Sequence, residues 1–122
     1  MIKSFKDLNI WQKAHRLVLD IYQLTNKFPK EEKFGLVSQI RRAAVSVVAN
    51  IAEGFRKRSN KEKVNFYTYS QSSLDEVEYY IILCRDLNFI TEDEKQKIDK
   101  EIQEIASMLG GLIKIIKNKK ST

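Results

Sequence analysis

The side chains most able to do chemistry in this chain are cations that cluster in one short stretch. Arg56, Lys57 and Arg58 are consecutive, and Lys61 and Lys63 follow them closely. The whole chain of 122 residues carries a formal net charge of +6. Clustered Lys and Arg attract nucleic acid, because contact with phosphates releases the counterions condensed on them. The stretch is therefore a candidate phosphate-binding element.

Residue types that catalyse reactions or bind metal ions are sparse. The chain has one histidine, His15, and one cysteine, Cys84. It lacks the Glu-x-x-His pairs that a di-iron bundle requires. We expect His15, on an apolar helix stripe, to be buried or interfacial, and Cys84 to be an inert core thiol with no base beside it. The acidic cluster Asp75, Glu76 and Glu78 is interpreted as solvated or interface-pairing. We predict no enzymatic activity, no cofactor and no metal.

Apolar periodicity predicts the helices that position these side chains. Pro29, the only proline, ends the first helix, because proline disfavours helix in the residue before it. Gly54 is the expected C-terminal cap of the second. Capping boxes are predicted to start the third and fourth helices, at Ser59 with Glu62 and at Thr91 with Glu94. The expected helices cover residues 7–26, 31–53, 60–88 and 92–117.

Long helices with short connections predict an all-α fold, an antiparallel up-down-up-down four-helix bundle, in one domain over residues 1–122. Gly110 and Gly111 interrupt the fourth helix, which suggests a close helix approach or a local irregularity. No segment is long and apolar enough to span a bilayer, and the N-terminus lacks a signal-peptide hydrophobic region. The single cysteine suits a reducing compartment. We expect a cytoplasmic protein with no membrane association.

This topology places the N-terminus, the second connector and the C-terminus at one end, the basic pole. Lys3 and Lys6 belong to this end as well. The residues predicted to bind nucleic acid there are Arg56, Lys57, Arg58, Lys61, Lys63, Lys114, Lys117, Lys119 and Lys120. Lys61 and Lys63 lie in a first helical turn, where the helix dipole disfavours cations. Phe55 is a candidate for base stacking, whereas Phe66 is expected in the core. The alternative is that these charges serve solubility and cap the fourth helix.

Two helices are more apolar than a single bundle requires. The second helix has a wide apolar arc and only a narrow polar stripe, and residues 79–84 are apolar on every side. Such surfaces indicate a subunit interface, although all proteins expose some apolar area. The predicted interface residues are Arg41, Arg42, Ser46, Asn50, Tyr79, Ile82 and Leu83.

Several motifs resemble one family of bacterial proteins. They are Trp11-Gln12-Lys13-Ala14, the run from Phe28 to Glu32, Phe34-Gly35-Leu36, the run from Ser38 to Ser46 and the run from Ala49 to Gly54. The pattern is similar to four-helix-bundle proteins encoded by intervening sequences in bacterial 23S ribosomal RNA genes. That family includes the accessory variability determinant of diversity-generating retroelements. The resemblance implies a homopentamer with a basic surface and, in the retroelement branch, nucleic acid and a reverse transcriptase as partners.

Two functional hypotheses from different classes follow. The first is an oligomeric protein that binds RNA or DNA through its basic pole. The second is a protein-interaction or scaffold assembly, for example with a reverse transcriptase, in which the charge has no direct role.

Overall fold

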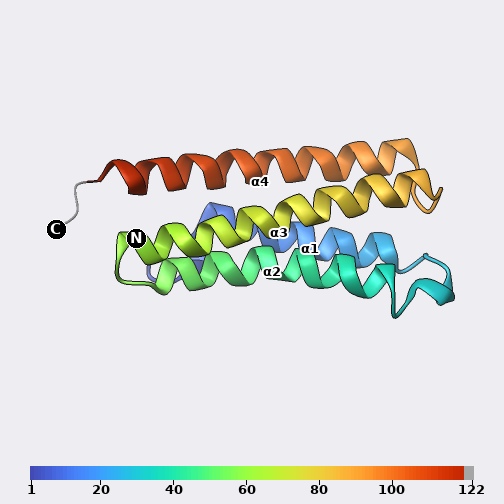
Figure 1. The fold of residues 1–122 in the computed structure, drawn as a ribbon, viewed down its shortest axis with the longest axis horizontal. Coiled ribbons are helices and arrows are strands. Elements are labelled where there is room, and N and C mark those ends of the chain that lie inside the picture. Colours follow the sequence, from blue (N-terminus) through green and yellow to red (C-terminus); the bar gives the residue numbers. More distant parts are fainter. Residues whose placement is uncertain (120–122) are drawn as a thin grey trace.

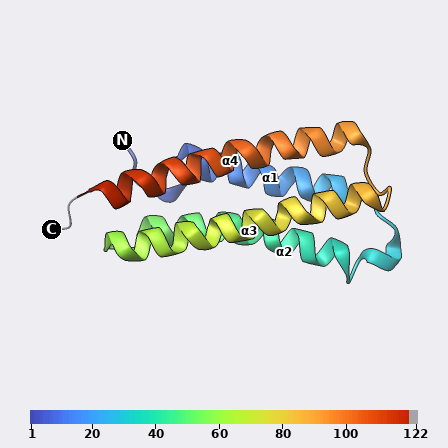
Figure 2. The same ribbon diagram turned by 45° about the horizontal axis from the view of Figure 1, so that its top comes forward.

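The computed structural model describes residues 1–119, which form an up-down-up-down bundle of four long helices (Figure 1). Helix α1 (Asn9–Thr25) is followed by α2 (Leu36–Arg56), α3 (Asn60–Asp86) and α4 (Glu92–Asn118). Successive helices are antiparallel, so the N-terminus, the α2–α3 connector and the end of α4 lie at one end (Figures 1 and 2). The predicted all-α, antiparallel four-helix bundle is confirmed. None of the helices in residues 1–119 combines the length and apolar character needed to cross a bilayer.

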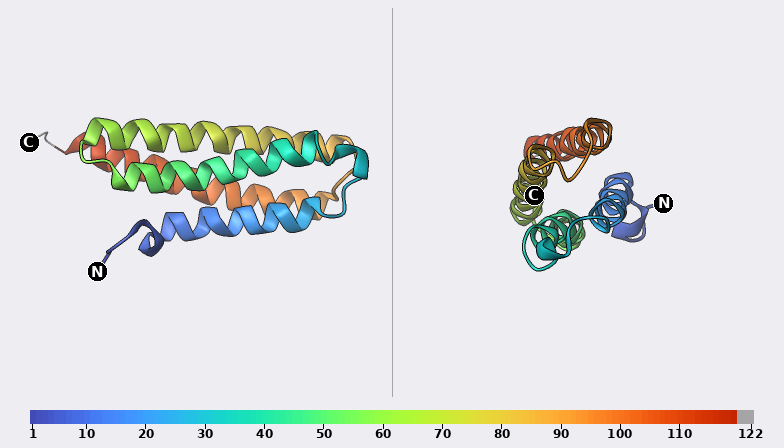
Figure 3. Two further views of the ribbon diagram at one scale, coloured as in Figure 1. Left: turned by 90° about the horizontal axis from the view of Figure 1, so that it is seen from below. Right: turned by 90° about the vertical axis from the view of Figure 1, so that its right-hand side faces the viewer.

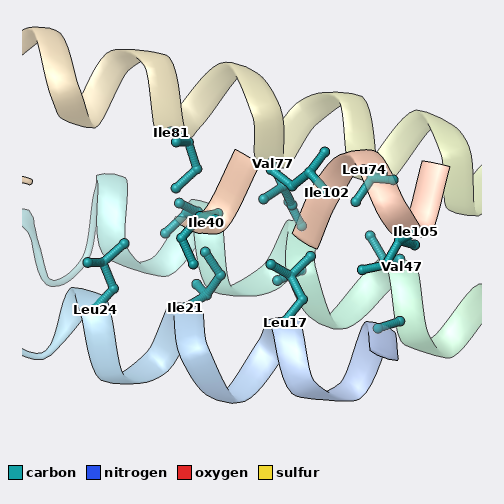
Figure 4. Packing of buried hydrophobic residues seen from close by; sticks show 14 of the residues in the cluster. Leu17, Ile21, Leu24, Ile40, Val47, Leu74, Val77, Ile81, Ile102 and Ile105 are labelled. Carbon is teal, nitrogen blue, oxygen red and sulfur yellow. The ribbon is translucent and has the colours of Figure 1, made fainter. Parts of the chain in front are cut away.

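The core runs along the bundle axis between all four helices (Figure 4). Its central layers contain Leu17 and Ile21 of α1, Ile40 of α2, Val77 of α3 and Ile105 of α4, all fully buried. These residues recur at steps of three and four along their helices, which places them on one face of each. Burial of this seam is the main source of stability, at roughly 1.5–3 kcal/mol for each large apolar side chain.

The helix ends agree with the predicted capping signals in part. At Thr91 both bonds of the capping box form with Glu94. Ser59 accepts from the Glu62 N–H, but the Glu62 carboxylate accepts from the Ser59 hydroxyl and not from its backbone. Helix α2 begins at Leu36, later than expected, because Lys30–Glu32 forms a separate 3-10 turn and the backbone of Gly35 is not helical.

Helices α2 and α3 lie side by side in the bundle (Figure 3). Gly54 lies inside α2, not at its end as predicted, and it is buried. A Cβ at this position would lie 2.6 Å from Cε1 of Tyr67, so the ring occupies the space that any side chain would need. One turn further along the seam, the buried Ser70 hydroxyl donates to the carbonyl of Val47 at 2.8 Å. These contacts fix the α2–α3 connector at the basic pole.

Close helix packing does not explain the glycines at positions 110 and 111. A Cβ built at either position meets nothing within 4 Å, and α4 continues through both without interruption. The predicted close approach or irregularity is therefore wrong within this chain. Beyond the two glycines the buried row continues through Ile113, whereas Leu112 is only half-buried.

The α1–α4 seam is partly polar. Lys13 pairs with Glu104, and Lys27 pairs with Glu94, across this seam. Between these pairs lies Glu101, whose buried Oε2 atom lacks a hydrogen-bond partner among the described residues. Burial, and then the neighbouring carboxylate of Asp20, raise the pKa of Glu101 to about 7. The seam therefore holds a carboxyl group that folding favours in its protonated form.

The two glycine environments predict opposite effects of the same substitution. Gly54→Ala should lower the free energy of unfolding by about 1–3 kcal/mol, because the new methyl group clashes with the buried Tyr67 ring. Gly111→Ala should raise it by about 1 kcal/mol, since alanine favours helix and meets no neighbour. Urea denaturation followed by circular dichroism measures both. Equal effects of the two substitutions would contradict this account of the α2–α3 contact.

Glu101 predicts a specific pH dependence of stability. Its pKa is raised from 4.5 to about 7 in the folded state. The protonated carboxyl group therefore stabilises the fold fully below pH 4.5, and this stabilisation is lost as the pH rises through 7. Glu101→Gln should remove this loss. The variant should gain stability over the wild type at pH 8 and differ little at pH 4.5. Glu76→Gln, at an exposed carboxylate, is the control, and a gain of equal size in this control would show that the effect is general charge relief.

Candidate functional site

A concave surface at the basic pole lies between the start of α3 and the end of α4. This basic hollow has a volume of about 510 Å³. Its charged lining residues are Arg58, Lys61, Lys117 and Lys119. Ser59, Asn60, Val64, Asn65 and Ile116 complete the lining, so no acidic residue contributes to it. The structure thus brings together cations that are far apart in the sequence.

Three of the predicted phosphate-binding cations have structural contacts instead. The Lys63 ammonium donates to the carbonyls of Gly54 at 3.2 Å and of Phe55 at 2.8 Å, and so caps the end of α2. Burial, and then the nearby Lys119, lower the pKa of Lys63. Lys57 pairs with Glu53 at 3.7 Å. The Arg56 guanidinium lies 4.8 Å from the centre of the Phe5 ring.

Lys63 also resolves an apparent conflict in the sequence. A cation in the first turn of α3 is unfavourable for that helix, but Lys63 reaches the carbonyl end of α2, where the helix dipole favours positive charge. Lys61 has no such contact and is exposed in the basic hollow. Of the remaining predicted residues, Lys114 is exposed on α4, and Lys120 lies outside the described residues.

Two aromatic residues near the basic pole each have one of these cations over the ring. The Lys57 ammonium lies 4.8 Å from the centre of the Phe66 ring, and Lys63 lies 5.7 Å from that of Phe55. Phe66 is only half-buried, so its predicted place in the core is wrong; its neighbour Tyr67 is buried there instead, 3% exposed. Sequence spacing could not show which of the two rings is buried, because the space for Tyr67 comes from Gly54 on another helix.

The residues considered for catalysis lie apart from one another. His15 is exposed and stacks on Trp11 with ring centres 5.1 Å apart, so it is not buried within this chain, and its place in an interface stays a prediction. Cys84 is fully buried, as predicted, and burial raises the pKa of its thiol to about 11, with a further contribution from Glu32. Among residues 1–119, no group of three or more His, Cys, Asp or Glu side chains could hold a metal ion.

Several of the predicted interface residues make contacts within the chain. Arg41 caps the end of α1, where its guanidinium donates to the Thr25 hydroxyl at 2.9 Å and to the Asn26 side chain at 3.0 Å. Ser46 hydrogen-bonds Ser73 of α3 at 2.8 Å. Asn50 donates to the carbonyl and the hydroxyl of Ser46, within α2. The remaining four, Arg42, Tyr79, Ile82 and Leu83, have no hydrogen bond or ion pair from their side chains within residues 1–119.

Comparison with known proteins identifies the family. Residues 6–111 match the family model of the 23S rRNA-intervening sequence protein, and the chain belongs to this family. Its fold is similar to the crystal structure of a protein of unknown function from the S23 ribosomal protein family of Bacteroides thetaiotaomicron, with a TM-score of 0.80 and 26% sequence identity. The alignment covers 86% of this chain and 95% of that chain. A search of curated proteins gave no match.

The contacts of Lys63 and Lys61 predict that two neighbouring lysines differ in their effect on stability. Lys63→Met should lower the free energy of unfolding by about 1 kcal/mol, because two carbonyls at the end of α2 lose their donor. Lys61→Met removes the same charge from an exposed position and should change stability by less than about 0.5 kcal/mol. Urea denaturation of both variants measures the difference. A larger loss in Lys61→Met would contradict the assignment of Lys63 as the structural cation.

Proposed function

We propose that this member of the 23S rRNA-intervening sequence protein family binds the phosphate backbone of RNA or DNA in its basic hollow, and that it does so without catalysis. The observation that carries the proposal is the composition of the hollow. Four cations, Arg58, Lys61, Lys117 and Lys119, line one concave surface that contains no carboxylate. A set of like charges repels itself, so its concentration at one place favours an anionic ligand over mere solubility.

The hollow suits phosphates better than bases. Base stacking needs an open aromatic face, but no aromatic residue lines the hollow, and Lys63 and Lys57 already lie over the rings of Phe55 and Phe66. The lining offers the amide groups of Asn60 and Asn65, which can bond phosphate or sugar oxygens. We therefore expect binding that depends weakly on sequence and strongly on salt concentration.

Oligomerisation belongs to this proposal. Each subunit would contribute one basic hollow, and several hollows on one assembly raise the effective concentration of cations along a strand. The homopentamer is an inference from the family resemblance. The second hypothesis, a protein-interaction assembly, is favoured by an apolar groove on the opposite side of α2 from α3. A reverse transcriptase as the protein partner stays a prediction.

A salt titration of binding tests the proposal. Fluorescence anisotropy would follow a labelled duplex DNA and a labelled RNA, each from low to physiological salt. For the triple variant Arg58→Ala/Lys61→Ala/Lys117→Ala, the slope of log K against log salt should fall by up to about 3, since each phosphate contact on B-DNA contributes about 0.9. Its affinity at low salt should also fall.

The matched control removes three cations away from the basic pole. Lys30→Ala/Lys33→Ala/Lys100→Ala has the same net charge as the first variant, and its lysines form no ion pair among residues 1–119. It should keep the wild-type slope. An equal loss in both variants would indicate unspecific attraction by net charge, and absence of binding by the wild type at low salt would refute the proposed function.

A further inference from the structure

The basic hollow lies at a step between two helices. At the basic pole α4 continues past the start of α3, so the last turn of α4 stands beside the first turn of α3 (Figures 1 and 2). Lys117 and Lys119 come from the end of α4, whereas Arg58 and Lys61 come from the connector and the first turn of α3. Along α3 the lining reaches only to Asn65, less than two helical turns from its start. The hollow is therefore confined to the end of the bundle.

A confined hollow suits the end of a nucleic acid strand better than its middle. An internal backbone runs past a binding surface in both directions, and the cations that follow it are arranged along a groove. Here the four cations surround one space of about 510 Å³. That volume is within the range of roughly 300–1,000 Å³ found for sites that bind small ligands. The shape therefore favours a compact anionic group over a continuous strand.

The first turn of α3 adds backbone donors to these cations. The first N–H groups of a helix have no acceptor within the helix itself. The Glu62 N–H donates to the Ser59 hydroxyl at 3.1 Å, but none of the hydrogen bonds found among residues 1–119 uses the N–H of Asn60 or of Lys61. Both of these residues line the hollow. The carboxylate of Glu62 accepts from the Ser59 hydroxyl and does not belong to the lining, so it leaves these donors to an anion.

We propose that the basic hollow binds the terminal phosphate of a nucleic acid strand in preference to the phosphodiesters within the strand. Its donors would be the surrounding cations and the N–H groups at the start of α3. A terminal phosphate carries a charge of about −1.5 to −2 at pH 7 and presents three acceptor oxygens. A phosphodiester has a single negative charge and two free oxygens. The inference rests on the proposed function, because it specifies which part of a nucleic acid the same site recognises.

Two short RNA duplexes of equal charge test the preference at pH 8. One carries a phosphate at a single 5′ end. The other has only hydroxyl ends but is one base pair longer, which adds one phosphodiester to each strand. A fluorophore at the far end of the labelled strand reports binding by anisotropy at low salt. The wild type should bind the phosphorylated duplex about tenfold more tightly, since charge-assisted hydrogen bonds each contribute about that factor. A second pair, with the phosphate at a 3′ end, shows which terminus is preferred.

Position 60 separates the backbone donor from the side chain. Asn60→Pro removes the N–H at the first residue of α3, where proline is compatible with a helix. The backbone of Ser59 is extended, at φ −88° and ψ 148°, which suits a residue before proline. Asn60→Ala removes the same side chain and keeps the N–H. Both variants should keep their helix content by circular dichroism, and Asn60→Pro should show the smaller preference for the phosphorylated duplex. Equal preferences in the two variants would overturn the role of the backbone donors.

Lys61→Met and Lys30→Met form the matched pair for the cations. Both lysines are exposed, but only Lys61 lines the hollow. Lys61→Met should reduce the preference for the phosphorylated duplex severalfold, and Lys30→Met should keep it.

The outcomes separate this inference from the proposed function. If the wild type binds the two duplexes of each pair equally, with the salt dependence expected of phosphate contacts, the inference is overturned and the proposed function stands. If it binds none of the duplexes at low salt, both are refuted.

Discussion

The close approach of α2 and α3 at Gly54 and Tyr67 is the constraint on which the rest of the structure depends. A buried ring takes the place of a side chain, so the two helices can meet directly before their connector. Lys63 then reaches back to cap α2, and the connector between them is held at both ends. The restrained connector carries Arg58, which lines the basic hollow together with the end of α4.

The cations of the basic pole fall into two groups: some stabilise the fold, and others are available for binding. Arg56, Lys57 and Lys63 are engaged with rings, a carboxylate or carbonyls, whereas the four cations of the basic hollow lie beside one another without an acidic neighbour in its lining. Two of the engaged cations, Lys57 and Lys63, also lie over the rings of Phe66 and Phe55. The same contacts therefore favour backbone recognition and determine which cations remain available for it.

The sequence was sufficient to predict the bundle, because apolar periodicity, one proline and the capping signal at Thr91 all agree. It was insufficient where the surroundings of a residue are formed by a different helix. Gly54 resembled a helix cap, but Tyr67 explains it; Lys63 resembled a free cation, but the end of α2 binds it. His15 followed the apolar stripe of α1, yet it lies at the exposed groove beside Trp11. The charge of the basic pole was visible in the sequence. Which of its cations make structural contacts, and which line the hollow, could be seen only from the packing of the helices.

The central claim is that phosphates bind in the basic hollow, and lysine footprinting tests it most directly. The protein would be acetylated briefly with and without duplex RNA at low salt, and modification of each lysine measured by mass spectrometry. The account predicts that RNA protects Lys61, Lys117 and Lys119, while Lys30, Lys33 and Lys100 react equally in both samples. Protection spread evenly over all exposed lysines, or confined to those away from the basic pole, would contradict it.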